Sequence, residues 1–244
     1  MNVADNYSSA WVFGALGGIG NKLLEVVVNN SNYVFACDIK SKGVENDLLG
    51  ATYYKINGCE ETELIAFAEK AVSLKGEPDL LVIASGYVSS ISLVESSPDE
   101  IDKIYQNNFK LVALVLKSFF ESCSKDVNVF KTVVIISSNA GFVSRPNQPI
   151  YAAMKCAINS LIRSQALEWG KYNIKINAIA PGTVAVPRNS DILKRKFDNF
   201  PSDPNRPLGK IAFPKDIVPV FQVLLEKDLK MTGQVIVLDG GSSL

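Results

Sequence analysis

The 244-residue chain contains no histidine, and this absence removes several kinds of active site at once. Without an imidazole there can be no Ser-His-Asp hydrolase, no Cys-His protease and no dehydrogenase whose proton donor is histidine. The cysteines, at positions 37, 59, 123 and 156, form no Cys-x-x-Cys pair, so no metal site is expected. Acid-base chemistry is left to Tyr, Lys, Asp, Glu or Cys, and free thiols in a reducing compartment are expected.

An excess of either charge is also missing. Lys and Arg total 25, as do Asp and Glu, so neither a nucleic acid nor an anionic membrane is indicated as a partner. No apolar run approaches the ~18 residues that span a bilayer. Residues 1–10 lack the basic start and apolar stretch of a secretory signal. We therefore expect a globular cytoplasmic protein whose partner is a small molecule.

Strand-like apolar runs alternate with helical patterns along the chain. We predict strands at Ala10–Phe13, Tyr33–Cys37, Thr52–Ile56, Leu80–Ala84, Thr132–Ser137, Ile174–Ile179 and Gln234–Leu238. We predict helices at Gly18–Asn29, Glu61–Leu74, Pro98–Gln106, Phe109–Cys123, Ile150–Gly170 and Pro214–Glu226. This alternation, with strands apolar on both faces, predicts an α/β fold in which helices cover both sides of a parallel sheet.

No repeat or linker divides the chain, so one domain is expected over residues 1–244. The one irregular stretch is Gly182–Leu208, which is rich in proline and polar residues. Long ordered loops tend to be functional, so residues 183–208 could form a flap over a substrate pocket. A plain surface excursion fits this stretch equally well.

Three spaced glycines lie where the first predicted strand meets the first helix. Gly14 permits a tight turn, Gly18 lets the backbone approach a pyrophosphate, and Gly20 lets the helix pack close to the sheet. The free N–H groups and the dipole of the helix N-terminus favour phosphates. A flexible glycine-rich turn is the alternative, but the position between strand and helix favours a dinucleotide site.

Asp38 ends the second strand, 18 residues after Gly20. A carboxylate at this position can accept both hydroxyls of an adenosine ribose and would repel a 2′-phosphate, which favours NAD over NADP. Lys40 and Lys42 lie close by and could hold that phosphate, so NADP is not excluded. A capping role for Asp38 is the structural alternative.

Tyr151 and Lys155 are four residues apart, so they share one face of a predicted helix. An ammonium group beside a phenol favours the phenolate and lowers the tyrosine pKa from about 10. Such a tyrosine is a general acid-base that works at neutral pH. Ser138 precedes the pair by thirteen residues and follows a predicted strand.

These motifs form an ordered set that resembles the short-chain dehydrogenase/reductase family over essentially the whole chain. The set is Gly14-x-x-x-Gly18-Ile19-Gly20, Asp38, Asn108, Ser138, Tyr151-x-x-x-Lys155, Pro181-Gly182, Arg206-Pro207-Leu208-Gly209-Lys210, Thr232-Gly233-Gln234 and Asp239-Gly240-Gly241. The resemblance implies one doubly wound Rossmann-type domain with a mostly seven-stranded parallel sheet in the order 3-2-1-4-5-6-7.

The resemblance also implies roles. Tyr151 exchanges a proton with the substrate oxygen, Lys155 assists it and holds the nicotinamide ribose, and Ser138 hydrogen-bonds the same oxygen. Asn108 holds a water that links Lys155 to solvent, with Asn107 as a rival one residue away. The implied cofactor-binding residues are Gly14, Leu16, Gly18, Ile19, Gly20, Asp38, Asn57, Ala84, Ser85, Gly86, Tyr151, Lys155, Pro181, Gly182 and Val184.

Four departures from the family pattern concern the cofactor groove rather than proton transfer. Phe13 replaces the usual Thr, and Ile83-Ala84-Ser85 replaces Asn-Asn-Ala before Gly86. Asn57 stands where an Asp usually meets the adenine, although its carbonyl can still accept that bond. Val186 stands where a Thr usually meets the carboxamide.

The leading hypothesis is an NAD(H)-dependent oxidoreductase that interconverts a secondary alcohol and a ketone. Two substrate classes stay open: a 3-oxoacyl thioester, or a ring hydroxyl as in the dihydrodiol dehydrogenases of the family. The second draws on Asp38, on the short span between the second and third strands, and on Ser144-Arg145-Pro146 before Tyr151. A non-catalytic cofactor sensor is the alternative class. Relatives pair the helices at Phe109–Cys123 and Ile150–Gly170, which implies a homotetramer or dimer, although both helices could merely be buried.

Overall fold

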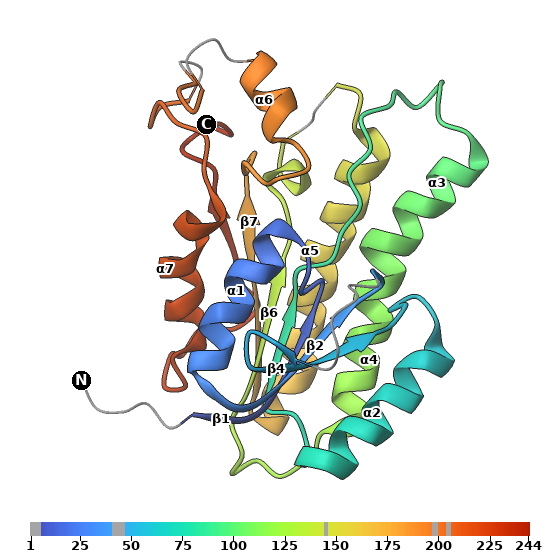
Figure 1. Cartoon of the computed structure of the whole chain (residues 1–244), viewed down its shortest axis with the longest axis vertical. Helices are drawn as coiled ribbons and strands as arrows, with labels where there is room; N and C mark the ends of the chain where they lie inside the picture. Colours follow the sequence, from blue (N-terminus) through green and yellow to red (C-terminus); the bar gives the residue numbers. More distant parts are fainter. Residues whose placement is uncertain (1–5, 41–46, 144–145, 197–199, 204–205) are drawn as a thin grey trace.

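The computed structural model describes residues 6–40, 47–143, 146–196, 200–203 and 206–244 (Figure 1). Within these residues the strands form a sheet in the order β3-β4-β2-β1-β5-β6-β7-β8. The strands are β1 (Tyr7–Phe13), β2 (Ser31–Asp38), β3 (Asp47–Leu48), β4 (Ala51–Lys55), β5 (Leu80–Ile83), β6 (Lys131–Ile136), β7 (Ile174–Pro181) and β8 (Val235–Leu238).

Seven of these strands are parallel, from β4 at one side to β8 at the other. Numbered as predicted, their order is 3-2-1-4-5-6-7, so the doubly wound fold class is confirmed. The addition is β3, a two-residue strand that pairs antiparallel with β4 at the sheet edge. It is too short to show a hydrophobic alternation.

Helices cover both faces of the sheet (Figure 1). They are α1 (Gly18–Asn29), α2 (Glu61–Lys75), α3 (Pro98–Tyr105), α4 (Leu111–Ser122), α5 (Pro149–Trp169), α6 (Ser190–Lys196) and α7 (Pro214–Leu225). Alternate residues of each strand point to opposite faces. In β1, Val12 joins the core under α1 and α7, whereas Trp11 and Phe13 join the core under α2, α4 and α5.

Two local features differ from the predicted helices. Between α3 and α4 the chain does not break but continues through a π-helical segment, Gln106–Lys110, whose wider turn follows no 3.6-residue period. The segment expected to be irregular, 183–208, includes the short helix α6. Among the described residues, no helix combines the length and the hydropathy needed to cross a membrane.

Candidate active site

The predicted site residues lie on segments that leave the carboxyl ends of the parallel strands. At this edge β1 has β2 on one side and β5 on the other, so the chain reverses its winding direction between them. Open α/β sheets bind ligands at such a switch point. Gly14 follows β1, Asp38 ends β2, Gly86 lies beyond β5, and Ser138 lies beyond β6.

The glycine-rich turn is packed too tightly for side chains. Gly14 has a φ of +81°, and a Cβ built on it would lie 2.6 Å from the Ser85 nitrogen. A Cβ on Gly20 would lie 2.0 Å from the Gly14 carbonyl oxygen, so these two glycines close the turn on itself. A Cβ on Gly18 would lie 2.6 Å from Val186 Cγ1. Gly18 is therefore covered by the segment that follows β7, which the sequence did not indicate.

Asp38 connects the end of β2 to this turn. One carboxylate oxygen accepts the Leu16 N–H at 3.0 Å, and the other accepts the Lys40 N–H at 3.1 Å. Each oxygen keeps a lone pair that can accept a ribose hydroxyl. Lys42, the second basic residue considered for a 2′-phosphate, lies outside the described residues.

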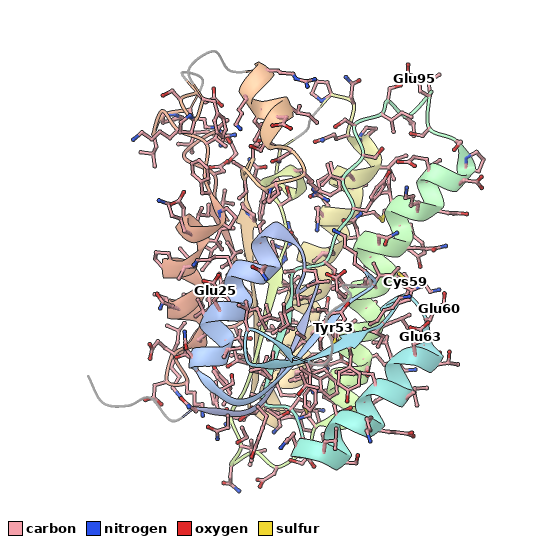
Figure 2. The ribbon with its side chains drawn as sticks, viewed as in Figure 1. Glu25, Tyr53, Cys59, Glu60, Glu63 and Glu95 are labelled. Atoms are coloured by element: carbon pink, nitrogen blue, oxygen red, sulfur yellow. The ribbon has the colours of Figure 1, made fainter. Side chains whose placement is uncertain are left out.

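Asn57 follows β4, and its side chain is engaged locally. Its carbonyl accepts the Cys59 N–H at 3.1 Å, and its own backbone N–H donates to Glu63 at 2.8 Å. Glu63 lies in the first turn of α2, near Cys59 and Glu60 (Figure 2). A bond from the adenine amino group to Asn57 therefore needs the second lone pair of an oxygen that already caps a turn.

Tyr151 and Lys155 come together on the buried face of α5. Both side chains are buried, and the Lys155 ammonium lies 5.5 Å from the centre of the Tyr151 ring. Within the described part of the chain, that ammonium donates one hydrogen bond, a long one of 3.5 Å to the Ile136 carbonyl. Burial lowers the pKa of Lys155 to about 8, so its charge is held at a cost in solvation.

Asn108, in the π-helical segment, is fully buried beside Lys155. Its amide group donates to the carbonyls of Tyr87 at 2.7 Å and Ile104 at 2.9 Å, whereas its carbonyl oxygen has no donor among the residues that the structure describes. A Cβ built on Gly86 would lie 3.3 Å from that oxygen and 3.6 Å from the Lys155 nitrogen. The rival, Asn107, donates to the Lys103 carbonyl and is not among the buried residues. Asn108 is thus the asparagine that faces Lys155.

Ser138 caps a 3-10 turn, Asn139–Gly141, that lies against α5. Its hydroxyl oxygen accepts the Ala140 N–H at 3.2 Å, which leaves the hydroxyl proton available to a ligand. Ser137 is buried and donates to Asn159 of α5 at 2.6 Å, so it does not share the role of Ser138.

The remaining predicted residues are placed as follows. Ala84 donates its N–H to the Phe13 carbonyl, and Ile19 packs in the core under α1. Pro181 ends β7, the Gly182 N–H donates to Leu238, and Val184 is buried in a bridge to Ala212. Ser144 and Arg145 lie outside the described residues.

Sequence reasoning gave no role to one part of this region. Asn139, directly after Ser138, donates to Asp239 at 2.9 Å, and both residues are buried. The two lie 100 residues apart in the chain. Asp239 was noted only as part of the closing Asp-Gly-Gly motif, and no spacing rule links it to Ser138.

A nicotinamide dinucleotide fits the residues that are present. The glycine turn at the first residue of α1 leaves room only for backbone, as a pyrophosphate site requires. The open carbonyl of Asn108 and the poorly paired ammonium of Lys155 are polar groups that such a site would use. The fold and these groups together define an oxidoreductase site of the dinucleotide-binding class.

A family model described as enoyl-(acyl carrier protein) reductase matches residues 14–243. A chloroplastic tropinone reductase homolog of Arabidopsis thaliana is 29% identical, over 98% of this chain and 76% of its own length. The 3-oxoacyl-[acyl-carrier-protein] reductase FabG of Thermotoga maritima is 27% identical, over 94% of this chain and 95% of its own.

Among solved structures, a 4-hydroxyisoleucine dehydrogenase complexed with NADH superposes with a TM-score of 0.78. It is 26% identical, and the match covers 97% of this chain and 98% of that one. The chain belongs to the short-chain dehydrogenase/reductase family, whose members bind NAD or NADP and act as oxidoreductases on CH–OH groups.

Proposed function

We propose that this protein is an NAD(H)-dependent oxidoreductase that interconverts a secondary alcohol and a ketone on a small molecule. The observation that carries the proposal is the buried Lys155 ammonium beside the Tyr151 ring, at the sheet edge where a dinucleotide binds. The hydride chemistry is supplied by the nicotinamide when it is bound.

The residues of the chain move the proton and hold the reacting oxygen. Tyr151 gives or takes the proton at its phenolic oxygen, and the Lys155 ammonium stabilises negative charge there. Ser138 donates its free hydroxyl proton to the substrate oxygen, where charge develops as hydride moves. The Asn108 carbonyl accepts a water hydrogen bond beside Lys155, which would open a proton path to solvent.

Tyr151→Phe tests the assignment. This variant keeps the ring but loses the proton, so turnover should fall by about 10³-fold or more while dinucleotide affinity stays nearly unchanged. Retained turnover would refute the role of Tyr151. If the wild-type protein binds NADH but turns over nothing in a broad panel of alcohols and ketones, a non-catalytic sensor becomes the better proposal.

NAD rather than NADP is proposed because the Asp38 carboxylate stands at the end of β2, held by Leu16 and Lys40. Its charge would oppose a 2′-phosphate at the adenosine ribose. Steady-state kcat/KM with each cofactor measures the preference. A strong preference for NADP would overturn this part of the proposal.

A free small molecule is proposed as substrate over a carrier-bound 3-oxoacyl thioester. The helix α3 and the segment before it carry Glu95, Asp99, Glu100 and Asp102 (Figure 2 labels Glu95). With only Lys103 of α3 to offset them, these carboxylates would repel a carrier domain that presents negative charge. The thioester stays the second candidate because FabG of Thermotoga maritima matches over nearly its whole length. Assays with cyclic alcohols, cyclic ketones and a 3-oxoacyl thioester separate the two.

We infer two further features. Segment 183–208 is proposed as a substrate flap, since its residue Val186 covers Gly18. A homo-oligomer paired through α4 and α5 is proposed because the family resemblance implies it. Light scattering that shows a monomer at micromolar concentration would count against the oligomer.

A further inference from the structure

Ser138 stands between two residues whose side chains are both fixed by buried hydrogen bonds. On one side, Ser137 donates to Asn159 of α5 at 2.6 Å. On the other, Asn139 donates its amide to Asp239 at 2.9 Å. Neither bond involves the Ser138 hydroxyl, so both act on its backbone. The direction of that hydroxyl thus depends on an anchor in α5 and an anchor in the turn after β8.

The Asp239 carboxylate accepts several hydrogen bonds. One oxygen accepts from Asn139 and from the Ser242 hydroxyl at 3.0 Å, and the other accepts the Gly241 N–H at 3.0 Å. A further hydrogen bond comes from the Ser243 side chain, and together these donors outweigh desolvation and lower the pKa of Asp239 to about 2. The carboxylate is charged at any pH at which the protein is assayed.

The backbone of Asp239 is held as firmly as its side chain. Its carbonyl accepts from Arg206 at 2.9 Å, and Arg206 forms a buried ion pair with Asp203 at 2.8 Å. A Cβ built on Gly182 would lie 2.8 Å from the Asp239 Cβ, so only glycine fits there after β7. Asp239 therefore holds together the segments that follow β6, β7 and β8, through Asn139, Gly182 and its own position. It also binds Arg206, near the carboxyl end of segment 183–208.

We propose that Asn139 is a positioning residue, which acts through its hydrogen bond to Asp239 to aim the Ser138 hydroxyl at the substrate oxygen. This inference rests on the proposed function, because the orientation of the Ser138 hydroxyl matters only if that hydroxyl binds a reacting oxygen. It adds a buried amide–carboxylate pair to the residues that set the rate, although neither member touches substrate.

Three variants test the proposal. Asn139→Ala removes the bond, and the swap Asn139→Asp with Asp239→Asn restores one hydrogen bond between the same two positions with the charge exchanged. The Asn139 amide also donates to the Ser242 hydroxyl at 3.3 Å, so the matched control is Ser243→Ala, which removes a different side-chain donor from the Asp239 carboxylate and leaves both of these Asn139 bonds in place. For each variant, kcat, both KM values and the free energy of unfolding are measured.

Asn139→Ala should lower kcat by about 10- to 100-fold, because small misplacements of a reacting group are costly. The KM for the dinucleotide should stay within about twofold, the swap should recover most of the lost kcat, and Ser243→Ala should keep kcat within about twofold. A wild-type kcat in Asn139→Ala overturns the proposal. So does an equal loss of kcat in Ser243→Ala, which would make the effect one of general destabilisation.

Crystal structures of the wild type and of Asn139→Ala give a readout that needs no turnover. The proposal expects the Ser138 hydroxyl oxygen to move by about 1 Å or to occupy several positions in the variant. An unmoved Ser138 overturns the inference even if the enzyme proves inactive. Absence of turnover in the wild type overturns the proposed function instead, so the two failures are distinguishable.

Discussion

Phe13 and Ile83 lie opposite one another on the parallel strands β1 and β5, and both are buried. Partners in register share a face of the sheet, and here that face is the core under α2. The Phe67 ring of α2 meets Phe13 edge-on, with 5.7 Å between ring centres. The family resemblance leads one to expect Thr and Asn at these two positions. Both polar residues have been replaced together, so apolar packing braces the sheet beneath the cofactor turn.

Ile83→Asn should therefore destabilise the protein by about 2–4 kcal/mol, because the amide would enter an apolar core with no partner. Phe13→Thr alone should also destabilise the protein, because it empties a buried aromatic site. It should cost less in the Ile83→Asn background than in the wild type, since a hydroxyl on the neighbouring strand can bond the new amide. Urea denaturation of the single and double variants measures this. Ile83→Val is the control and should cost only about 1 kcal/mol. If Ile83→Asn alone were as stable as the control, the two positions would not form a matched apolar pair.

Lys155 should destabilise the folded protein, because its charged ammonium group is buried. Its folded-state pKa is about 8, and that of an unfolded lysine is about 10.4. Between these values the unfolded chain holds the extra proton, so stability rises with pH from 8 to 10.4, and below 8 the full burial penalty is present. Lys155→Met should therefore raise the free energy of unfolding of the dinucleotide-free protein by up to about 3 kcal/mol at pH 7.

The gain from Lys155→Met should shrink toward zero as the pH rises through 8 to 10, and turnover should be lost at every pH. Urea denaturation at pH 7 and pH 10 gives the comparison. Lys70→Met, on the exposed face of α2, is the control and should change stability little at either pH. A Lys155→Met variant that is less stable than the wild type at pH 7 would contradict the burial penalty.

Local sequence patterns predicted most of the fold correctly. The order of the seven parallel strands follows from their alternation with helices, and the helical spacing of Tyr151 and Lys155 put both on one face. Features shorter than the periods being sought were missed, as with the two-residue β3 and the seven-residue α6. The π-helical segment at Gln106–Lys110 was read as a break, because its extra residue per turn disrupts the 3.6 period.

Long-range contacts are what the sequence could not provide. Asn139 and Asp239 are 100 residues apart in the sequence, and Val186, which lies against Gly18, is also distant from it in the sequence. Such pairs depend on how the loops after β1, β6, β7 and β8 fold over one another at one sheet edge. Neither propensity nor periodicity describes that folding, so the fine geometry of the site emerges only in three dimensions.

Asp38→Asn should shift the cofactor preference toward NADP. The amide keeps one acceptor for the backbone N–H groups that Asp38 binds, but loses the charge that opposes a 2′-phosphate. The ratio of kcat/KM for NADP to that for NAD should rise about tenfold, as expected for one partly screened charge interaction. Asp38→Glu is the control, since it keeps the charge and should keep the preference for NAD. An unchanged ratio in Asp38→Asn would remove Asp38 from cofactor selection.

The contact between Gly18 and Val186 makes a prediction about dinucleotide binding that needs no substrate. Gly18→Ala should weaken NADH affinity, because the new methyl group would lie 2.6 Å from Val186 Cγ1 and push the segment after β7 away from the glycine turn. The Val186 Cβ would lie almost as close, at 2.7 Å, so the whole side chain has to be removed. Adding Val186→Gly does this and should restore much of the affinity. Gly20→Ala is the matched contrast: its methyl group would meet the Gly14 carbonyl oxygen at 2.0 Å, a backbone obstacle that Val186→Gly cannot relieve. Titration calorimetry with NADH on both single and both double variants gives the comparison. Equal rescue of Gly18→Ala and Gly20→Ala by Val186→Gly, or rescue of neither, would show that the Val186 side chain does not set the space above Gly18.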